Sequence, residues 1–235
     1  MLNPRAMSPK DSALDDLKAR ILKMELRPGD ALEEAPLCTA YGLSRTPMRE
    51  VFQKLAAAGF ITLSPGRGAE VSQIELARLR QFFASAPLLH ALIARQAVEG
   101  CDESALYQLR AAQASVRKAR VARNAAAMAL ADYGFHVALC QIADNPYLGP
   151  SLERLLIDQT RMSHRFYAGA NAEDSRRFER AMDEHDRIID ACARGDAARA
   201  VSVAMAHWES LREQIEAYVH PAPLADEAGL LDDLN

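Results

Sequence analysis

Residues 41–60 read YGLSRTPMREVFQKLAAAGF, and this stretch determines how the N-terminal region folds. Gly42 suits the end of a short helix that starts near Glu34, because glycine readily adopts the positive φ of a helix C-cap. Gly59 suits the end of a second helix over 45–58 for the same reason. The stretch therefore predicts two helices joined by a tight turn.

The flanking sequence extends this pair of helices into a larger motif. Residues 11–24 space leucine and isoleucine in a helical stripe, which Arg27-Pro28-Gly29 ends. After Gly59, residues 60–63 and 69–71 alternate like two short strands around a turn rich in glycine and proline. Helix, short helix, tight turn, helix and hairpin, in that order, predict a winged helix-turn-helix.

The helix predicted over 45–58 has one side for the core and one for a partner. Its apolar side chains share one side of a helical wheel: Met48, Val51, Phe52 and Leu55. Arg49 lies on the opposite side, with Arg45 at its N-terminal edge. Two arginines one turn apart suit the major groove, where an arginine donates twice to guanine, and Arg67 in the hairpin suits the minor groove or the DNA backbone. Taken singly, each arginine also fits a solvated surface position, so the ordered set carries the interpretation.

This ordered set resembles the GntR superfamily of bacterial transcription regulators across nearly all of residues 14–74. Its most specific element is Ser44-Arg45-Thr46-Pro47-x-Arg49-Glu50, and the other matching elements are Leu26-Arg-Pro-Gly29, Gly59-Phe-Ile61 and Pro65-Gly-Arg-Gly68. The resemblance implies DNA contacts from Ser44, Arg45, Thr46 and Arg49, and from the wing turn at Arg67 and Gly68. Ala35 stands where some relatives have an arginine, so the operator sequence does not carry over.

The composition of the 235-residue chain is that of a globular protein, with 49% hydrophobic and 26% charged residues. Its net charge of −4 arises in the tail, because residues 221–235 carry four acids and no base. A DNA-binding head is therefore compatible with the acidic balance. The first ten residues lack the apolar core of a signal peptide, and no uncharged stretch reaches the roughly 20 apolar residues of a membrane helix. The sequence predicts a cytoplasmic protein with no membrane association.

From Glu75 onward the pattern becomes all-helical. The segment is rich in alanine and leucine with a period near 3.6, and its glycines, asparagines and prolines divide it into about six helices. We expect a mainly α protein, with a winged helix-turn-helix over 8–74 and an antiparallel bundle of six or seven helices over 75–218. Residues 219–235 are expected to form a flexible acidic tail.

Three histidines and an aspartate of the helical segment fall on apolar helix faces: Asp132, His136, His185 and His207. A single histidine there is usually a core residue, but three histidines and a costly inward carboxylate from three helices favour a divalent transition metal. Asp132 and His136 are one turn apart, a ligand spacing known from helical bundles. The four cysteines are too scattered for a zinc knuckle and are expected to be reduced core residues.

Residues 75–215 resemble the FCD effector domain of FadR-type GntR regulators, through Asp132-x-x-Phe135-His136, Asn145-Pro146, Glu184-His185 and His207. The resemblance implies that Asp132, His136, His185 and His207 hold a divalent ion, zinc or nickel, beside a pocket for a small organic acid. Many relatives have an arginine and then a glutamate in the first effector helix, where this chain has Ala86 and His90. We therefore take His90 and Arg161 as candidate contacts of the acid.

Three functions remain open at this point. The preferred one is a dimeric transcription regulator that binds a roughly palindromic operator, with half-sites about one duplex turn apart. The DNA affinity of this regulator responds to a small carboxylate at the metal. Release from DNA is the usual direction of the response in the family. The second is a sensor whose ligand is the metal ion itself. The third is a metal-dependent hydrolase or lyase joined to a DNA-binding head, with Glu184 as its one candidate base.

Overall fold

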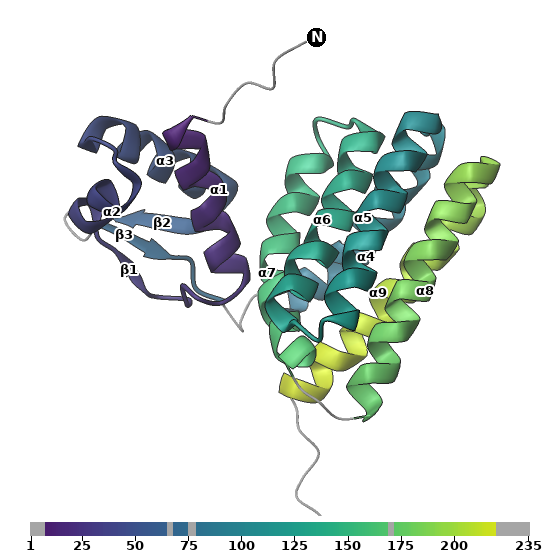
Figure 1. The fold of residues 1–235 in the computed structure, drawn as a ribbon. Helices are drawn as coiled ribbons and strands as arrows, with labels where there is room; N and C mark the ends of the chain where they lie inside the picture. The colour runs from purple at the N-terminus through teal and green to yellow at the C-terminus, as the bar shows by residue number, and fades with distance from the viewer. Residues whose placement is uncertain (1–7, 65–67, 75–78, 169–171, 220–235) are drawn as a thin grey trace, which may run out of the picture.

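The computed structural model describes residues 8–64, 68–74, 79–168 and 172–219. Within these residues the chain forms a small winged head and a larger helical bundle, which lie side by side in Figure 1. Both contain the elements that the sequence predicts, with one additional short strand in the head, and the fold is mainly α. The predicted acidic tail lies outside the described residues, apart from its first position.

The winged head runs from helix to hairpin in the predicted order. Its elements are α1 (Pro9–Leu22), β1 (Ala31–Leu32), α2 (Glu34–Tyr41), α3 (Arg45–Ala58), β2 (Ile61–Ser64) and β3 (Gly68–Val71). Gly42 and Gly59 take the left-handed backbone at the ends of α2 and α3, with φ of 64° and 86°. Helix α1 starts two residues before the predicted range, because the Ser8 side chain caps it by accepting from the Asp11 amide.

The sheet of the head contains one strand more than the sequence predicts. Strand β1 pairs antiparallel with β3, which pairs antiparallel with β2, so the order is β1-β3-β2. A two-residue strand with a single buried side chain, Leu32, gives no alternating pattern to detect. The core of the head lies between this sheet and the helices, with Leu17, Met48, Val51 and Leu55 fully buried.

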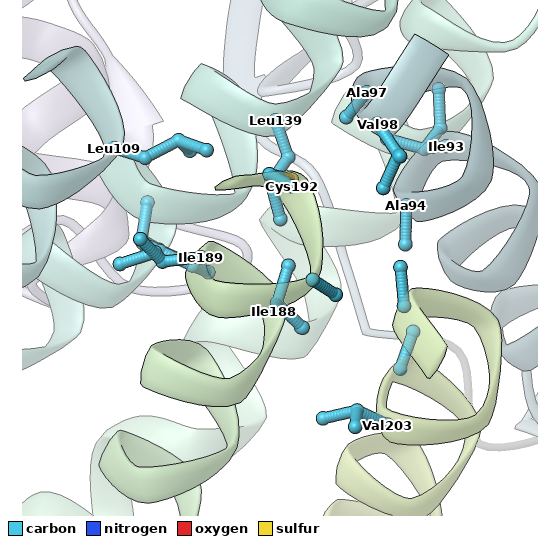
Figure 2. Close-up of a cluster of buried hydrophobic side chains, with 14 of the residues drawn as sticks. Ile93, Ala94, Ala97, Val98, Leu109, Leu139, Ile188, Ile189, Cys192 and Val203 are labelled. Atoms are coloured by element: carbon cyan, nitrogen blue, oxygen red, sulfur yellow. The ribbon is translucent and has the colours of Figure 1, made fainter. Parts of the chain in front are cut away.

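The bundle contains six helices among the described residues, as predicted. They are α4 (Leu79–Glu99), α5 (Glu103–Val121), α6 (Ala125–Ala143), α7 (Gly149–Ala168), α8 (Ala172–Arg194) and α9 (Ala197–Val219). Pro87 lies inside α4 without ending it. Helix α4 packs along α9, α5 along α6, and α6 along α7. Figure 2 shows part of the core, where side chains of α4, α8 and α9, among them Ile93, Ile188 and Val203, point toward one another.

Helix α6 is long and apolar enough to cross a membrane, the one such helix in the described part of the chain. Its mean hydropathy reaches 1.2 although Asp132 lies within the segment, and for this reason no uncharged stretch of that length marks the helix in the sequence. Helix α6 packs against α4, α5 and α7, and Asp132 and His136 lie on its buried face. Its apolar character is therefore that of a bundle core helix.

Two helices of the bundle face the head. Helix α1 packs against α6 and α7 (Figure 1). Helix α3 also contacts α7. The side chain of Ile157 on α7 is buried within the core of the head itself. Helix α7 is therefore shared between the two parts of the molecule.

Candidate metal centre and nucleic-acid interface

Helix α3 presents a row of exposed polar side chains. Met48, Val51 and Leu55 are fully buried beneath it, so its remaining surface faces away from the head. The residues on this exposed surface include Ser44, Arg45, Thr46, Arg49, Gln53 and Lys54. Ser44 stands at the N-cap position with an extended backbone, although its side chain makes no capping hydrogen bond. All four sequence-predicted DNA contacts of this helix are thus accessible from one side.

One carboxylate holds both arginines of α3. Arg49 donates from Nε to an oxygen of Glu34 at 3.0 Å, and Arg45 Nε lies 3.8 Å from the other oxygen. Glu34 is at the start of α2, so it connects the two helices of the helix-turn-helix. The arginines keep 74% and 64% of their side chains exposed, which leaves their outer N–H groups available to a partner. The role of Glu34 was not predictable from the sequence, because nothing in the pattern pairs this residue with α3.

A groove separates α2 and α3 from the wing. It encloses about 750 Å³ and is lined by Arg49, Gln53, Ser64 and Gly68, among other residues. Gly68 is exposed, has a φ of 83°, and has open space where a side chain would stand. The predicted contact Arg67 lies outside the described residues. Polar groups of α3 and of the wing therefore border the same groove, an arrangement that can follow the backbone of a duplex.

Three of the four predicted metal ligands meet in the centre of the bundle. His136 from α6, His185 from α8 and His207 from α9 are buried, and one ligand nitrogen from each lies within 4.8 Å of the others. Asp132 stands beside them, with Oδ1 3.7 Å from His185 Nε2. Among the described residues, Nε2 of His136 and Nε2 of His185 are buried without a hydrogen-bond partner. Buried lone pairs converging on one point are what a divalent transition metal requires, so these residues fit the ion that the sequence predicts.

Hydrogen bonds fix which nitrogen of His185 and of His207 faces the centre. Gln113 donates its amide to the Met182 carbonyl and to Asp186, which turns its oxygen toward His185. That oxygen is 3.1 Å from His185 Nδ1, so Nδ1 carries the proton and Nε2 keeps its lone pair. The Glu184 carboxylate accepts from His207 Nδ1 at 3.0 Å and fixes the same tautomer. Such partners orient the rings and raise the basicity of metal-binding imidazoles.

Burial also keeps the rings of His136 and His185 uncharged. Desolvation lowers the pKa of His136 and of His185 well below the ordinary histidine value, and the neighbouring imidazoles lower both further. A neutral imidazole is the form that binds a metal. Glu184, the candidate base of the hydrolase alternative, is occupied by His207 and is buried. The site thus has the donors of a binding site, and its one candidate base is engaged in holding a ligand.

His90 forms the next layer of the cluster. Its ring lies 5.0 Å from the His136 ring, edge to face, and stacks on Trp208. His90 Nε2 is 3.0 Å from Gln159 Oε1 on α7, and burial lowers the pKa of His90 to about 4. A narrow cavity of about 10 Å³ is bordered by His90, His136 and His207, which is about the room that one water molecule needs.

Arg161, the second candidate contact of an acid, lies elsewhere. Its guanidinium, 1% exposed, donates to the Ser72 carbonyl at 2.6 Å and pairs with Asp158. Ser72 directly follows the last strand of the wing. The structure therefore places Arg161 where α7 meets the end of the head, and its contact with an effector stays a prediction.

Comparison with known proteins identifies a family for each half of the molecule. Residues 86–210 match the FCD domain family, and residues 9–71 match the bacterial regulatory proteins of the gntR family. The FCD match alone spans more than half of the chain. This chain belongs to the GntR regulators with an FCD domain. As such, it is a DNA-binding transcriptional regulator with an effector-binding domain, and neither its domains nor its relatives are enzymes.

The relatives of this FCD-type regulator are themselves described as transcriptional regulators. It is 24% identical to the HTH-type transcriptional regulator LutR of Bacillus subtilis, over 83% of this chain and 95% of LutR. It is 26% identical to the HTH-type transcriptional repressor RspR of Escherichia coli, over 85% of each chain. Among solved structures, E. coli McbR/YncC superposes with a TM-score of 0.76 at 18% identity, covering 92% of this chain and 100% of that one. A GntR regulator from Rhodococcus sp. RHA1 gives 0.67 at 20% identity, covering 88% and 96%; these two likenesses support the fold alone.

Proposed function

We propose that this regulator is a cytoplasmic, homodimeric repressor that releases a roughly palindromic operator when a small carboxylate binds beside a divalent metal, zinc or nickel. His136, His185, His207 and Asp132 would hold the ion. When bound, the ion supplies a Lewis-acidic position for a carboxylate oxygen. The exposed face of α3, with Ser44, Arg45, Thr46 and Arg49, would read the operator, and the wing turn at Arg67 and Gly68 would add contacts to its backbone.

The observation that carries the proposal is the position of α7. Leu152 of this helix borders the narrow cavity beside the histidines, and Gln159 contacts His90. The opposite side of the same helix sends Ile157 into the core of the head and Arg161 to the Ser72 carbonyl. One helix therefore touches both the site of the ligand and the part that binds DNA.

The small size of the cavity provides a way for ligand binding to change DNA binding. A cavity of about 10 Å³ has no room for an organic acid, so a carboxylate must move the walls apart in order to bind. Helix α7 is one of those walls, and its displacement changes the position of the head. A ligand that binds one arrangement better than the other shifts the equilibrium between them and changes DNA affinity by the same coupling free energy.

The experiment measures operator binding by the zinc-loaded protein. An operator is selected from a pool of random duplexes, and its Kd is followed by fluorescence anisotropy while lactate, malate, citrate and gluconate are added in turn. We expect at least one acid to raise the Kd by about 5- to 150-fold, the usual range of allosteric coupling. An operator Kd that follows zinc concentration and ignores every acid would favour the metal sensor instead.

A variant of the shared helix tests the coupling separately. Arg161→Gln removes the contact with the Ser72 carbonyl while the histidines stay in place. We expect unchanged metal content and operator binding, together with a smaller response of the operator Kd to the active acid. A full response in this variant would show that Arg161 neither carries the coupling nor contacts the acid.

A further inference from the structure

Two of the four cysteines meet where α5 begins and α8 ends. Cys101 directly precedes Asp102, the N-cap of α5, and Cys192 lies in the last turn of α8. Cys101 packs against the bundle core, which contains Cys192, and Figure 2 shows Cys192 there on α8. A hydrogen bond joins the two thiols. All four cysteines of the chain are free, so these two sulfurs are in contact without a covalent bond.

The two thiols of this pair differ in exposure and in hydrogen-bonding role. Cys192 is 5% exposed, whereas Cys101 is partly exposed. The hydrogen bond lowers the pKa of Cys101 and raises that of Cys192, so the Cys192 S–H donates to the Cys101 sulfur. Cys101 can itself donate to the Asp102 carbonyl, 4.0 Å away. An outer thiol that solvent reaches thus lies beside an inner thiol that it does not, as in a reactive cysteine with its resolving partner.

Cys38 provides an internal comparison. It is partly exposed, like Cys101, and lies on α2 of the head. It packs against the core of the head, which contains no second cysteine among its described residues. Exposure alone therefore does not distinguish Cys101 from Cys38, whereas the adjacent thiol does.

We propose that Cys101 and Cys192 form an oxidation site, at which a peroxide produces a reversible disulfide that links the start of α5 to the end of α8. The Cys101 thiolate attacks one peroxide oxygen, the O–O bond breaks, and hydroxide leaves with the Cys101 proton as water. Cys192 then loses its proton and its sulfur attacks the resulting sulfenic acid, which forms the S–S bond and releases a second water. Two thiols lose two electrons and two protons, and hydrogen peroxide becomes two molecules of water.

The surroundings of Cys101 determine which conditions oxidise the pair. Burial raises the pKa of Cys101 and the Asp102 charge adds to this effect, while the hydrogen bond from Cys192 and the Arg110 charge oppose it. The net shift is upward, so the reactive thiolate is a minor form near neutral pH. The pair therefore stays reduced in a reducing cytosol and is oxidised by a sustained excess of peroxide, as expected for a transient intracellular disulfide.

The disulfide would restrain the part of the bundle that carries the histidines. Helix α8 carries His185 two turns before Cys192, and α5 carries Gln113, the hydrogen-bond partner of His185. A covalent link between α5 and α8 limits how far these helices can move apart. Formation of the disulfide is independent of the proposed function, but its effect on operator binding rests on that function.

Peptide mapping of the full-length protein tests the site. The reduced protein is treated with millimolar hydrogen peroxide, remaining thiols are blocked with N-ethylmaleimide, and tryptic peptides are analysed by mass spectrometry with and without reduction. We expect peptides 96–110 and 188–194 to be joined by a link that dithiothreitol breaks. If peroxide modifies Cys38 while Cys101 and Cys192 stay free, or if Cys101 becomes a sulfinic acid without any linked peptide, the inference is overturned.

The rate of linkage and two variants test the order of the steps. Because the Cys101 thiolate is the attacking form and its pKa is raised, the linked peptide should form about tenfold faster for each pH unit between 7 and 9. C192A should stop at a sulfenic acid on Cys101, which dimedone traps, whereas C38S should form the link as the wild type does. Dimedone trapping at Cys192 in place of Cys101 would contradict the assigned roles.

Operator binding separates this inference from the proposed function. The ratio of operator Kd with and without the active acid should move toward one in the oxidised wild type and return after dithiothreitol. Peroxide-treated C101S, the control, should keep the full ratio. An unchanged ratio in the fully linked protein would refute the restraint of α8. A reduced wild type that responds to no acid would refute the proposed function and leave the oxidation site standing.

Discussion

The two candidate sites of the molecule differ in how they hold their polar groups. On α3, Arg45 and Arg49 are largely exposed and share one partner, Glu34. In the bundle, His185 and His207 are buried, and each has a hydrogen-bond partner of its own, Gln113 and Glu184. An exposed site receives a large partner without rearrangement, whereas a closed site admits a ligand only when helices move. The closed site is therefore the part of the molecule that can act as a switch.

Removal of one histidine should have the largest effect. H185A deletes one of the proposed metal ligands, so metal affinity should fall by more than the roughly 10- to 100-fold that loss of a hydrogen-bonding partner costs. Because the ion binds the folded state, the melting temperature should fall together with metal content. Metal analysis and thermal melting, with and without a chelator, check both.

The control for this prediction is H164A, which changes a half-buried histidine of α7 outside the cluster. A chelator should lower the melting temperature of the wild type and of H164A but leave H185A unchanged. This comparison separates loss of the ion from the cavity that the smaller side chain leaves beside Phe135. A fully metallated H185A would remove His185 from the site.

The two sites also differ in what the sequence allows one to predict. The α3 face comes from one contiguous stretch, so helical periodicity alone separates Arg49 from the buried Met48. The histidines come from three helices, and periodicity predicts that each points inward but not that they meet. The contact of Gln113 with His185 and that of Arg161 with Ser72 were beyond prediction of this kind, because the two partners lie 72 and 89 residues apart in the sequence. Such pairings depend on how the helices pack, which local patterns do not specify.

The next largest effect should come from the exposed site. R49A removes a side chain placed to donate to a guanine, and we expect operator affinity to fall roughly 10- to 100-fold, within the range for one bidentate base contact. The melting temperature should stay the same, because the side chain is 64% exposed. Anisotropy titrations of the operator and of an unrelated duplex measure both affinity and specificity. R110A, an exposed arginine on α5, is the control, and equal operator affinity in R49A and R110A would contradict the role of α3.

A smaller effect should follow when a partner of the cluster is changed in place of a ligand. E184Q keeps an oxygen that accepts from His207 Nδ1 but removes its charge, so the ring stays oriented and becomes less basic. We expect metal affinity to fall by about tenfold. D183N removes the same charge from the neighbouring exposed residue and should leave affinity unchanged. Competition with a coloured chelator measures both, and equal affinities in E184Q and D183N would show that Glu184 does not support the ion.

The smallest effect should arise where the exposed site most resembles the buried one, in the pairing of Glu34 with the arginines. E34Q removes a negative charge beside the DNA-binding face, so binding to an unrelated duplex should strengthen by about two- to fivefold at low salt, because phosphate contacts respond to charge. Operator binding should gain less, since the neutral amide oxygen orients Arg49 more weakly than the carboxylate does. E33Q, an exposed neighbour whose side chain makes no capping hydrogen bond, is the control. The ratio of operator affinity to affinity for the unrelated duplex decides the role of Glu34. If this ratio is the same in E34Q and E33Q, Glu34 neutralises charge without orienting the arginines. The exposed site then lacks the positioning that Gln113 and Glu184 provide to the histidines of the buried site.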